Sequence, residues 1–226
     1  MKNINLIVKK INIGDIEQNF DTMLQRLYPE RREAVLRLRI KKNACMSLAS
    51  GMLLQEIIWR ECKIAPEELK LGKGEQGKPY IIGREDFQFN MSHSGNYVAL
   101  AYGDCALGID IEKIREKDSA VAKRCFTQEE YEYILKGFSN NSIKLHEDSN
   151  GMLKDINRRF FRIWTMKESY LKCTGTGISI PLNSFYVNPA TLMVEDTGYR
   201  FQIWDDEEYC IALCTEEEVR VRCVSM

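Results

Sequence analysis

Two carboxylates share one face of a short predicted strand near the middle of the sequence. Residues 107–112 alternate, with Leu107, Ile109 and Ile111 on one side and Gly108, Asp110 and Glu112 on the other. Upstream, the run Ser92-His93-Ser94-Gly95 offers hydroxyls, an imidazole and a permissive turn. Carboxylates suit a hard cation, and the upstream groups suit phosphate oxygens. The pattern therefore predicts metal-assisted chemistry on a phosphate ester, and Gly108 would let another group approach the backbone closely.

A third carboxylate, Glu168, lies within a predicted helix over residues 158–172. At 100° per residue, Glu168 falls on an arc with Phe161, Trp164 and Leu171, and Lys172 lies at its edge. Burial of this carboxylate would cost several kcal/mol unless a cation or a metal ion compensates. The alternative is an ordinary structural ion pair between Glu168 and a nearby arginine, Arg158 or Arg159.

Composition excludes several classes of protein. The 226 residues are 44% hydrophobic and 29% charged with a net charge of -1, which is typical of a soluble globular protein and lacks the basic excess of a nucleic-acid binder. No apolar run is long enough for a membrane span, and the N-terminal residues alternate like a strand rather than a leader, so we expect a cytoplasmic protein. Eight cysteines without a CxxC pair, and only two histidines, predict neither a zinc site nor a disulfide framework.

The order of predicted elements indicates an α/β (α+β) fold. We expect a pseudo-two-fold pair of similar halves, residues 1–105 and 106–226, each with antiparallel strands packed on helices. The expected elements are an edge strand at 3–11, helices at 15–27, from Pro29 and at 43–59, a glycine-rich hairpin at 71–82, helices from about 119 and after a capping box at Thr127 and Glu130, and strands at 199–204, 209–214 and 219–224. The basic run at 31–42 is either a solvated helix face or an anion-binding patch. The polar stretch at 137–157 predicts a long mobile loop.

Taken together, the motifs resemble those of the 4'-phosphopantetheinyl transferases, in particular the stand-alone type that activates surfactin synthetase. The resemblance covers most of the chain and rests on motifs in a fixed order: PERRE at 29–33, GKPY at 77–80, FNMSHSG at 89–95, GIDIE at 108–112, FTxxEY at 126–131, WxxKESYxK at 164–172 and PLNSF at 181–185. It implies a pseudo-dimeric enzyme that transfers the phosphopantetheine arm of coenzyme A to a serine of an apo acyl or peptidyl carrier protein and releases adenosine 3',5'-bisphosphate. The first half would hold the nucleotide, and the second half the metal ion and the carrier protein.

The same resemblance implies roles for individual residues. Asp110, Glu112 and Glu168 match the acidic positions that hold Mg²⁺, and Lys172 matches the lysine that meets the phosphates. Glu168 also matches the proposed base for the serine hydroxyl, which leaves open whether it acts directly or through a metal-bound water. The remaining positions expected to contact coenzyme A are Arg31, Ser47, Lys78, Pro79, Ser92 and His93. Met46, next to Ser47, stands where the family commonly has an arginine, so we expect weaker contact with the nucleotide unless Lys42 or Arg39 substitutes.

Two other functions compete with the transferase. One is a non-catalytic protein of the same fold that binds coenzyme A or a carrier protein, and the other is a metal-dependent phosphohydrolase. The sequence has no second cluster of metal ligands, which disfavours the hydrolase. Lys123, Arg124, Phe126 and Tyr131 in the second half are candidates for the surface that meets an acidic carrier protein, or else ordinary helix surface and core. The sequence does not identify the client pathway, and we expect a monomer.

Overall fold

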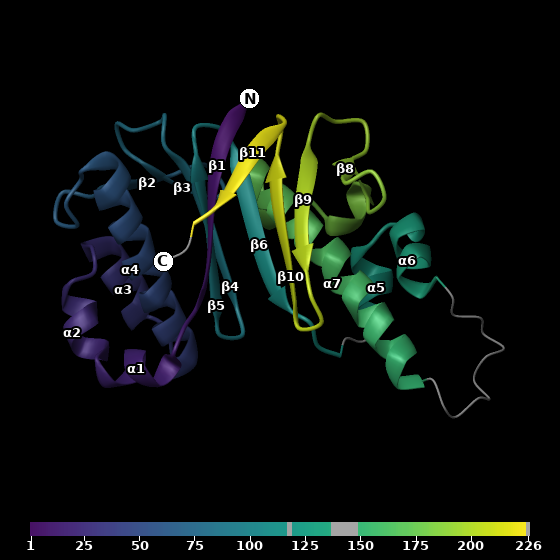
Figure 1. Ribbon diagram of the computed structural model, residues 1–226, viewed down its shortest axis with the longest axis horizontal. Helices are drawn as coiled ribbons and strands as arrows, with labels where there is room; N and C mark the ends of the chain where they lie inside the picture. The colour runs from purple at the N-terminus through teal and green to yellow at the C-terminus, as the bar shows by residue number, and fades with distance from the viewer. Residues whose placement is uncertain (117–118, 137–148, 225–226) are drawn as a thin grey trace.

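The first sheet takes three strands from the first half of the chain and one from residues 219–223, and helices cover it on one side (Figure 1). A computed structural model describes residues 1–116, 119–136 and 149–224. The sheet has the order β11-β1-β5-β4, from strands β1 (Lys2–Lys10), β4 (Gln88–Ser94), β5 (Tyr97–Gly103) and β11 (Val219–Cys223). Its helices are α1 (Ile13–Gln18), α2 (Phe20–Gln25), α3 (Pro29–Leu36) and α4 (Lys41–Cys62). A separate hairpin, β2 (Leu71–Lys73) and β3 (Pro79–Ile81), confirms the glycine-rich turn between residues 71 and 82.

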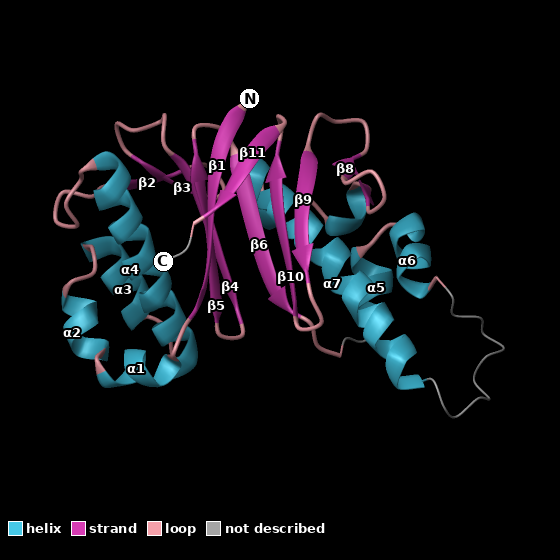
Figure 2. Ribbon diagram, in the orientation of Figure 1, coloured by secondary structure: helices cyan, strands magenta, loops and turns pink. Residues whose placement is uncertain are grey.

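The second half repeats this plan around one long helix (Figure 2). Its sheet has the order β6-β10-β9-β8-β7, from β6 (Leu107–Lys113), β7 (Val187–Asn188), β8 (Met193–Val194), β9 (Arg200–Asp205) and β10 (Tyr209–Thr215). The helices are α5 (Ser119–Cys125), α6 (Gln128–Leu135) and α7 (Ser149–Thr174), with short 3₁₀ turns at Gly177–Ser179 and Leu182–Ser184. Helices packed on mainly antiparallel sheets thus form the expected α+β fold. The division at residue 105 remains a prediction.

The two sheets meet where β4 lies beside β6. The side-chain oxygen of Asn90 accepts a hydrogen bond from the Ile109 N–H at 2.9 Å, and the Ser94 hydroxyl accepts one from the Lys113 N–H at 3.0 Å. These two bonds join strands that share no backbone ladder. An apolar layer from both sheets, which includes Ile109 and Ile111, packs on the inner face of β6. Asp110 and Glu112 therefore face the other way, as the alternation predicts.

Several expectations about the elements are wrong. The strand at the N-terminus lies inside its sheet, because β11 pairs with it in parallel on one side and β5 antiparallel on the other. The helix expected at 15–27 is two short helices, since the backbone at Asn19 (φ -107°, ψ 14°) leaves the helical region. Ser92 to Ser94 belong to β4, and the turn begins at Gly95 (φ 59°). Residues 149–157 of the expected loop are helical, because α7 begins at Ser149, whereas 137–148 lie outside the described residues.

The capping box expected at the start of the second half's helices is confirmed. Thr127 caps α6, and Glu130 completes the capping box. Gly175 (φ 71°) ends α7 in the left-handed region. All eight cysteines lie in described residues and are free thiols. No helix among the described residues is long and apolar enough to cross a membrane.

Candidate active site

Helix α7 lies directly against β6 because of one glycine. A Cβ atom at Gly108 would be 2.1 Å from the Ser169 carbonyl oxygen and 2.3 Å from the Cys173 nitrogen, both backbone atoms of α7. No side chain fits in that space, which confirms the close backbone approach expected at this position. The contact places Glu168 and Lys172 of α7 over the face of β6 that carries Asp110 and Glu112.

Asp110 is the buried centre of the site. Its Oδ1 accepts hydrogen bonds from the Lys172 ammonium at 2.6 Å and from the Ser92 hydroxyl at 2.8 Å, and Lys172 also donates to Ser92 Oγ at 3.1 Å. Its Oδ2 is buried without a hydrogen-bond partner. Burial raises the pKa of Asp110, although Lys172 and Ser92 oppose that shift. A buried oxygen with free lone pairs, beside a fixed cation, is suited to a further positive ligand.

Glu112 lies two residues further along the same face, closer to solvent. Its Oε2 accepts a hydrogen bond from the Ser94 hydroxyl at 2.7 Å and lies 3.3 Å from the guanidinium of Arg115. Because Ser94 is also bonded to the backbone of Lys113, it fixes the end of β4 against the end of β6. The paired serines Ser92 and Ser94 thus orient the two strand carboxylates.

Glu168 faces these carboxylates from α7. In the part of the chain that the structure describes, it makes no ion pair, and burial followed by the negative charge of Asp110 raises its pKa. The alternative of pairing with Arg158 or Arg159 is wrong. Arg158 pairs with Asp205 at 3.4 Å, and Arg159 donates to the carbonyls of Ile134 and Lys136. A half-buried carboxylate of raised pKa is a stronger base than an ordinary glutamate and is therefore suited to accept a proton.

A cavity of about 280 Å³ opens beside Glu168 and Lys172, and its other wall is the hairpin turn with Gln76, Lys78 and Pro79. Lys78 Nζ donates to the carbonyl oxygens of Leu107 at 2.9 Å and Cys173 at 2.8 Å, so it ties the hairpin to the start of β6 and the end of α7. Burial lowers the pKa of Lys78. Its ammonium is therefore committed to the protein backbone, and Pro79 follows on this anchored strand.

Arg31, Ser47 and His93 form the side of the site contributed by the first half. Arg31 packs over Gly51, and its Nε donates to the Ser47 carbonyl at 3.2 Å. The His93 ring is open to solvent at its surface, but desolvation by the surrounding protein, and then the charges of Arg31 and Lys172, lower its pKa. His93 on β4 and Arg31 on α3 thus lie near Lys172 on α7, so three groups that can donate hydrogen bonds approach the site. The Met46 side chain is buried in the core of this half, away from solvent.

The three carboxylates have the chemistry that a magnesium ion requires, but they lie further apart than the ligands of a bound ion. Asp110, Glu112 and Glu168 supply hard oxygen donors, and Asp110 Oδ2 is unpaired. However, among the described residues no three Asp, Glu, His or Cys side chains are gathered closely enough to hold a metal ion. In this arrangement the Lys172 ammonium neutralises Asp110 directly.

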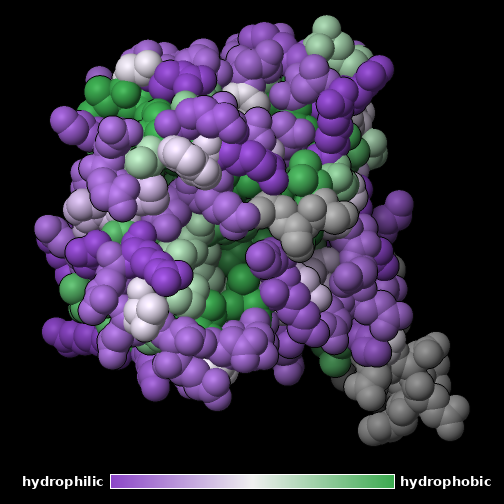
Figure 3. Space-filling model, turned by 60° about the vertical axis from the view of Figure 1, so that its left-hand side comes forward, coloured by the Kyte–Doolittle hydropathy of each residue, from purple (hydrophilic) through white to green (hydrophobic). Residues whose placement is uncertain are grey.

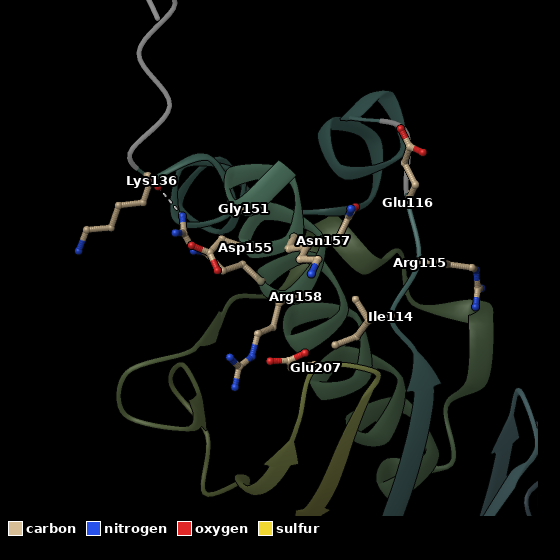
Figure 4. Close-up of a pocket in the computed structure, with 11 residues that line it drawn as sticks. Ile114, Arg115, Glu116, Lys136, Gly151, Asp155, Asn157, Arg158 and Glu207 are labelled. Atoms are coloured by element: carbon tan, nitrogen blue, oxygen red, sulfur yellow. Dashed lines mark hydrogen bonds between the residues drawn. The ribbon is translucent and has the colours of Figure 1, made fainter. Parts of the chain in front are cut away.

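A basic hollow and an apolar hollow are among those that lie away from these carboxylates. The larger, about 760 Å³, is lined by Arg115, Lys136, Arg158 and Arg159 among others, and Figure 4 shows the bond from Arg159 to Lys136 at its edge. Most of these basic groups are already engaged by carboxylates or carbonyls. An apolar hollow of about 610 Å³ lies between β1, α1, α2 and α4. Figure 3 shows hydrophobic residues, in green, at the bottom of a hollow on this side of the molecule. Neither hollow brings together groups for phosphate chemistry.

Sequence reasoning missed a buried ion pair behind Glu168. Lys167 Nζ lies 2.8 Å from Glu130 Oε1, and both side chains are 0% exposed. The ammonium also donates to the carbonyls of Leu182 and Phe185, while Glu130 accepts from the N–H groups of Val187 and Thr127. The pair locks α6 and the chain after α7 onto the helix that carries Glu168. The signal in the sequence is a lysine among apolar positions, directly before the glutamate. Of the proposed carrier contacts, Phe126 is buried core.

Comparison with known proteins identifies the family. A family described as the 4'-phosphopantetheinyl transferase superfamily matches residues 106–215, and one described as the N-terminal part of 4'-phosphopantetheinyl transferase matches 15–104. A 4'-phosphopantetheinyl transferase of Bacillus subtilis is 32% identical over 206 residues, which is 86% of this chain and 84% of the relative. The psf-1 transferase of Bacillus pumilus is 31% identical over 199 residues, 86% of this chain and 78% of the relative. The chain therefore belongs to the 4'-phosphopantetheinyl transferase superfamily, as an enzyme of the stand-alone surfactin-synthetase-activating type.

Proposed function

We propose that the protein transfers the 4'-phosphopantetheine group of coenzyme A to a serine of an apo acyl or peptidyl carrier protein, with Mg²⁺. The products would be the holo carrier protein and adenosine 3',5'-bisphosphate. The observation that carries this proposal is the buried Asp110, bridged to Lys172 and Ser92, with the unpaired Glu168 facing it. Such a site combines positive charge for phosphate oxygens with a group able to take a proton.

The reaction assigns a task to each of these groups. The serine Oγ of the carrier forms a bond to the β-phosphorus of coenzyme A, and the bond from that phosphorus to the bridging oxygen of the α-phosphate breaks. Glu168 takes the serine proton, directly or through a water, and its raised pKa suits it to this role. Lys172 stabilises charge on the phosphate oxygens, and Ser92 orients Asp110.

We propose Asp110, Glu112 and Glu168 as the residues that hold Mg²⁺. Bound there, the ion would neutralise charge on the pyrophosphate oxygens. The unpaired Asp110 Oδ2 supports this assignment, and so does the raised pKa of Asp110 and of Glu168, because burial disfavours their negative charges and a bound cation would compensate for that cost. The hard oxygen donors are of the type that Mg²⁺ prefers.

We propose that coenzyme A lies against the first half, residues 1–105. Its phosphates would meet Arg31, Ser92, His93 and Lys172, with Ser47 beside Arg31 and Pro79 along the hairpin. Lys78 would act by holding the hairpin in place, since its ammonium is bonded to two carbonyls. The metal ion would lie in residues 106–226, where the carrier serine must arrive. We infer a cytoplasmic monomer that binds neither nucleic acid nor membrane.

Intact-mass spectrometry tests the reaction. An apo peptidyl carrier protein and an apo fatty-acid carrier protein are incubated separately with the enzyme, coenzyme A and Mg²⁺. Transfer adds about 340 Da, the mass of the phosphopantetheine group, to the carrier serine. Loss of the gain after chelation of the metal, and recovery with added Mg²⁺, would support the ion. Binding of coenzyme A with no mass gain on either carrier would refute the proposed reaction and favour a binding protein.

A further inference from the structure

The connection between α3 and α4 exposes an unusual amount of apolar surface. Leu36 is 64% exposed, Leu38 40% and Ile40 62%. These are three of the nine large hydrophobic side chains that are exposed among the described residues, and they fall within five consecutive positions. Isolated exposed apolar residues are common, but a cluster is typical of a surface that meets a partner. We call residues 36–43 the α3–α4 segment; all eight are exposed.

The same segment is strongly basic. Its sequence, LRLRIKKN, carries four cations and no carboxylate. Among the residues that the structure describes, only Arg37 of this segment forms an ion pair, with Glu33 at 3.2 Å, and that pair is itself exposed. Aliphatic side chains that alternate with arginine and lysine suit a partner that is acidic and also presents apolar groups.

The start of α4 adds to this positive surface at a cost in helix stability. Ile40 occupies the N-cap and provides no side-chain hydrogen bond, and the first turn contains Lys41 and Lys42 without any acidic residue. Helices favour Ser, Thr, Asp or Asn at the N-cap and negative charge in the first turn. Helix α4 has neither feature, since an isoleucine occupies its N-cap and two lysines lie in its first turn. An acidic partner would supply the missing negative charge.

The segment adjoins the proposed coenzyme site. Leu36 is five residues beyond Arg31 on α3, about 8 Å along the helix, and Lys41 is six residues before Ser47 on α4, about 9 Å. A partner of about 80 residues is roughly 25–30 Å across, so one that rests on the segment can still reach Glu168. An anionic membrane bound to the same segment would place no reacting group near Glu168.

We propose that the α3–α4 segment is a docking surface for the carrier protein, through an acidic helix of the carrier whose apolar residues contact Leu36, Leu38 and Ile40. This inference rests on the proposed function. It extends the carrier's contacts to the first half of the enzyme, beyond the second half where the serine reacts. The exposed aliphatic residues supply the contact area, and the cations select the acidic partner.

Direct binding and transfer are measured together on matched variants. The apolar variant is Leu36→Ser with Ile40→Ser, and the charge variant is Lys41→Glu. Their controls are Ile82→Ser, an apolar residue 57% exposed at the end of β3, and Arg220→Glu on β11. The binding constant of a fluorescently labelled apo carrier protein is followed by anisotropy, and KM values for carrier and for coenzyme A are taken from transfer. Thermal midpoints verify folding.

The proposal predicts that both test variants weaken carrier binding and raise the carrier KM by about tenfold or more, with the coenzyme A KM within about twofold of wild type. The controls keep wild-type values. Carrier binding that falls only in the test variants supports the surface even if no mass gain occurs, so this outcome separates it from the proposed reaction. Unchanged carrier binding, or an equal rise in the coenzyme A KM for the apolar variant, overturns it. So does segment-dependent binding to phosphatidylglycerol vesicles with no binding to the carrier.

Discussion

Replacement of Gly108 by alanine tests whether the contact between β6 and α7 sets the geometry of the site. The added methyl carbon would lie 2.1 Å and 2.3 Å from two backbone atoms of α7, whereas ordinary contacts begin near 3.4 Å. The helix must therefore move outward by about 1 Å. A shift of that size stretches the 2.6 Å bond between Lys172 and Asp110 beyond hydrogen-bonding range. Misplacement of about 1 Å costs about 100-fold in rate, and overpacking costs about 1–3 kcal/mol of stability.

The assay compares kcat/KM for transfer, and the thermal midpoint, in Gly108→Ala and in Gly151→Ala. Gly151 also lies on α7, but nothing stands within 4 Å of its added Cβ. The control should match wild type or be slightly more stable, because alanine favours helix. We expect Gly108→Ala to remain folded below its lowered midpoint and to lose about 100-fold in kcat/KM. Wild-type activity and stability in Gly108→Ala would refute the argument that this glycine positions α7.

Four further substitutions and measurements address single groups. Asp110→Asn should lower kcat at least 100-fold, since it removes a charge at the centre of the site; retention of a tenth of the activity would contradict this role. His93→Ala should raise the KM for coenzyme A several-fold with little change in kcat, and an unchanged KM would count against a phosphate contact. Lys167→Met should cost about 3–5 kcal/mol in urea unfolding, because it strands the buried Glu130; a loss below about 1 kcal/mol would be inconsistent with that ion pair. Because burial raises the pKa of Glu168, titration of its carboxylate by NMR in the metal-free protein should give a pKa above the ordinary glutamate value of about 4.3, and a pKa at that value would argue against this burial.

Local signals in the sequence predicted the core of the site. The alternation at 107–112 placed Asp110 and Glu112 on one face, and helical periodicity placed Glu168 and Lys172 together, because each pattern depends only on neighbouring residues. Gly108 indicated a close contact because a glycine inside a strand has few other uses. The helix partner itself was identified only by the structure.

Features that depend on distant residues were missed. The parallel pairing of β1 with β11 joins the two ends of the chain, and no local pattern reports it. The Glu130–Lys167 pair connects a capping residue to a helix 37 positions later, so the capping box alone did not indicate burial. At 149–157 a polar composition favoured a loop, but the helix that contains Phe160 and Phe161 extends back through these residues. The packing of the buried part of α7 outweighs the weak helix propensity of its first residues.

The parallel pairing of β1 with β11 also affects how the protein is made. During synthesis β1 can pair with β5 as soon as Gly103 has emerged, but its other edge has no partner until Val219–Cys223 are translated. At about 5–20 residues per second, that interval is about 6–24 seconds. For this time the nascent first half presents an open strand edge that can pair with another chain. Shielding of that edge until β11 emerges would therefore reduce such pairing.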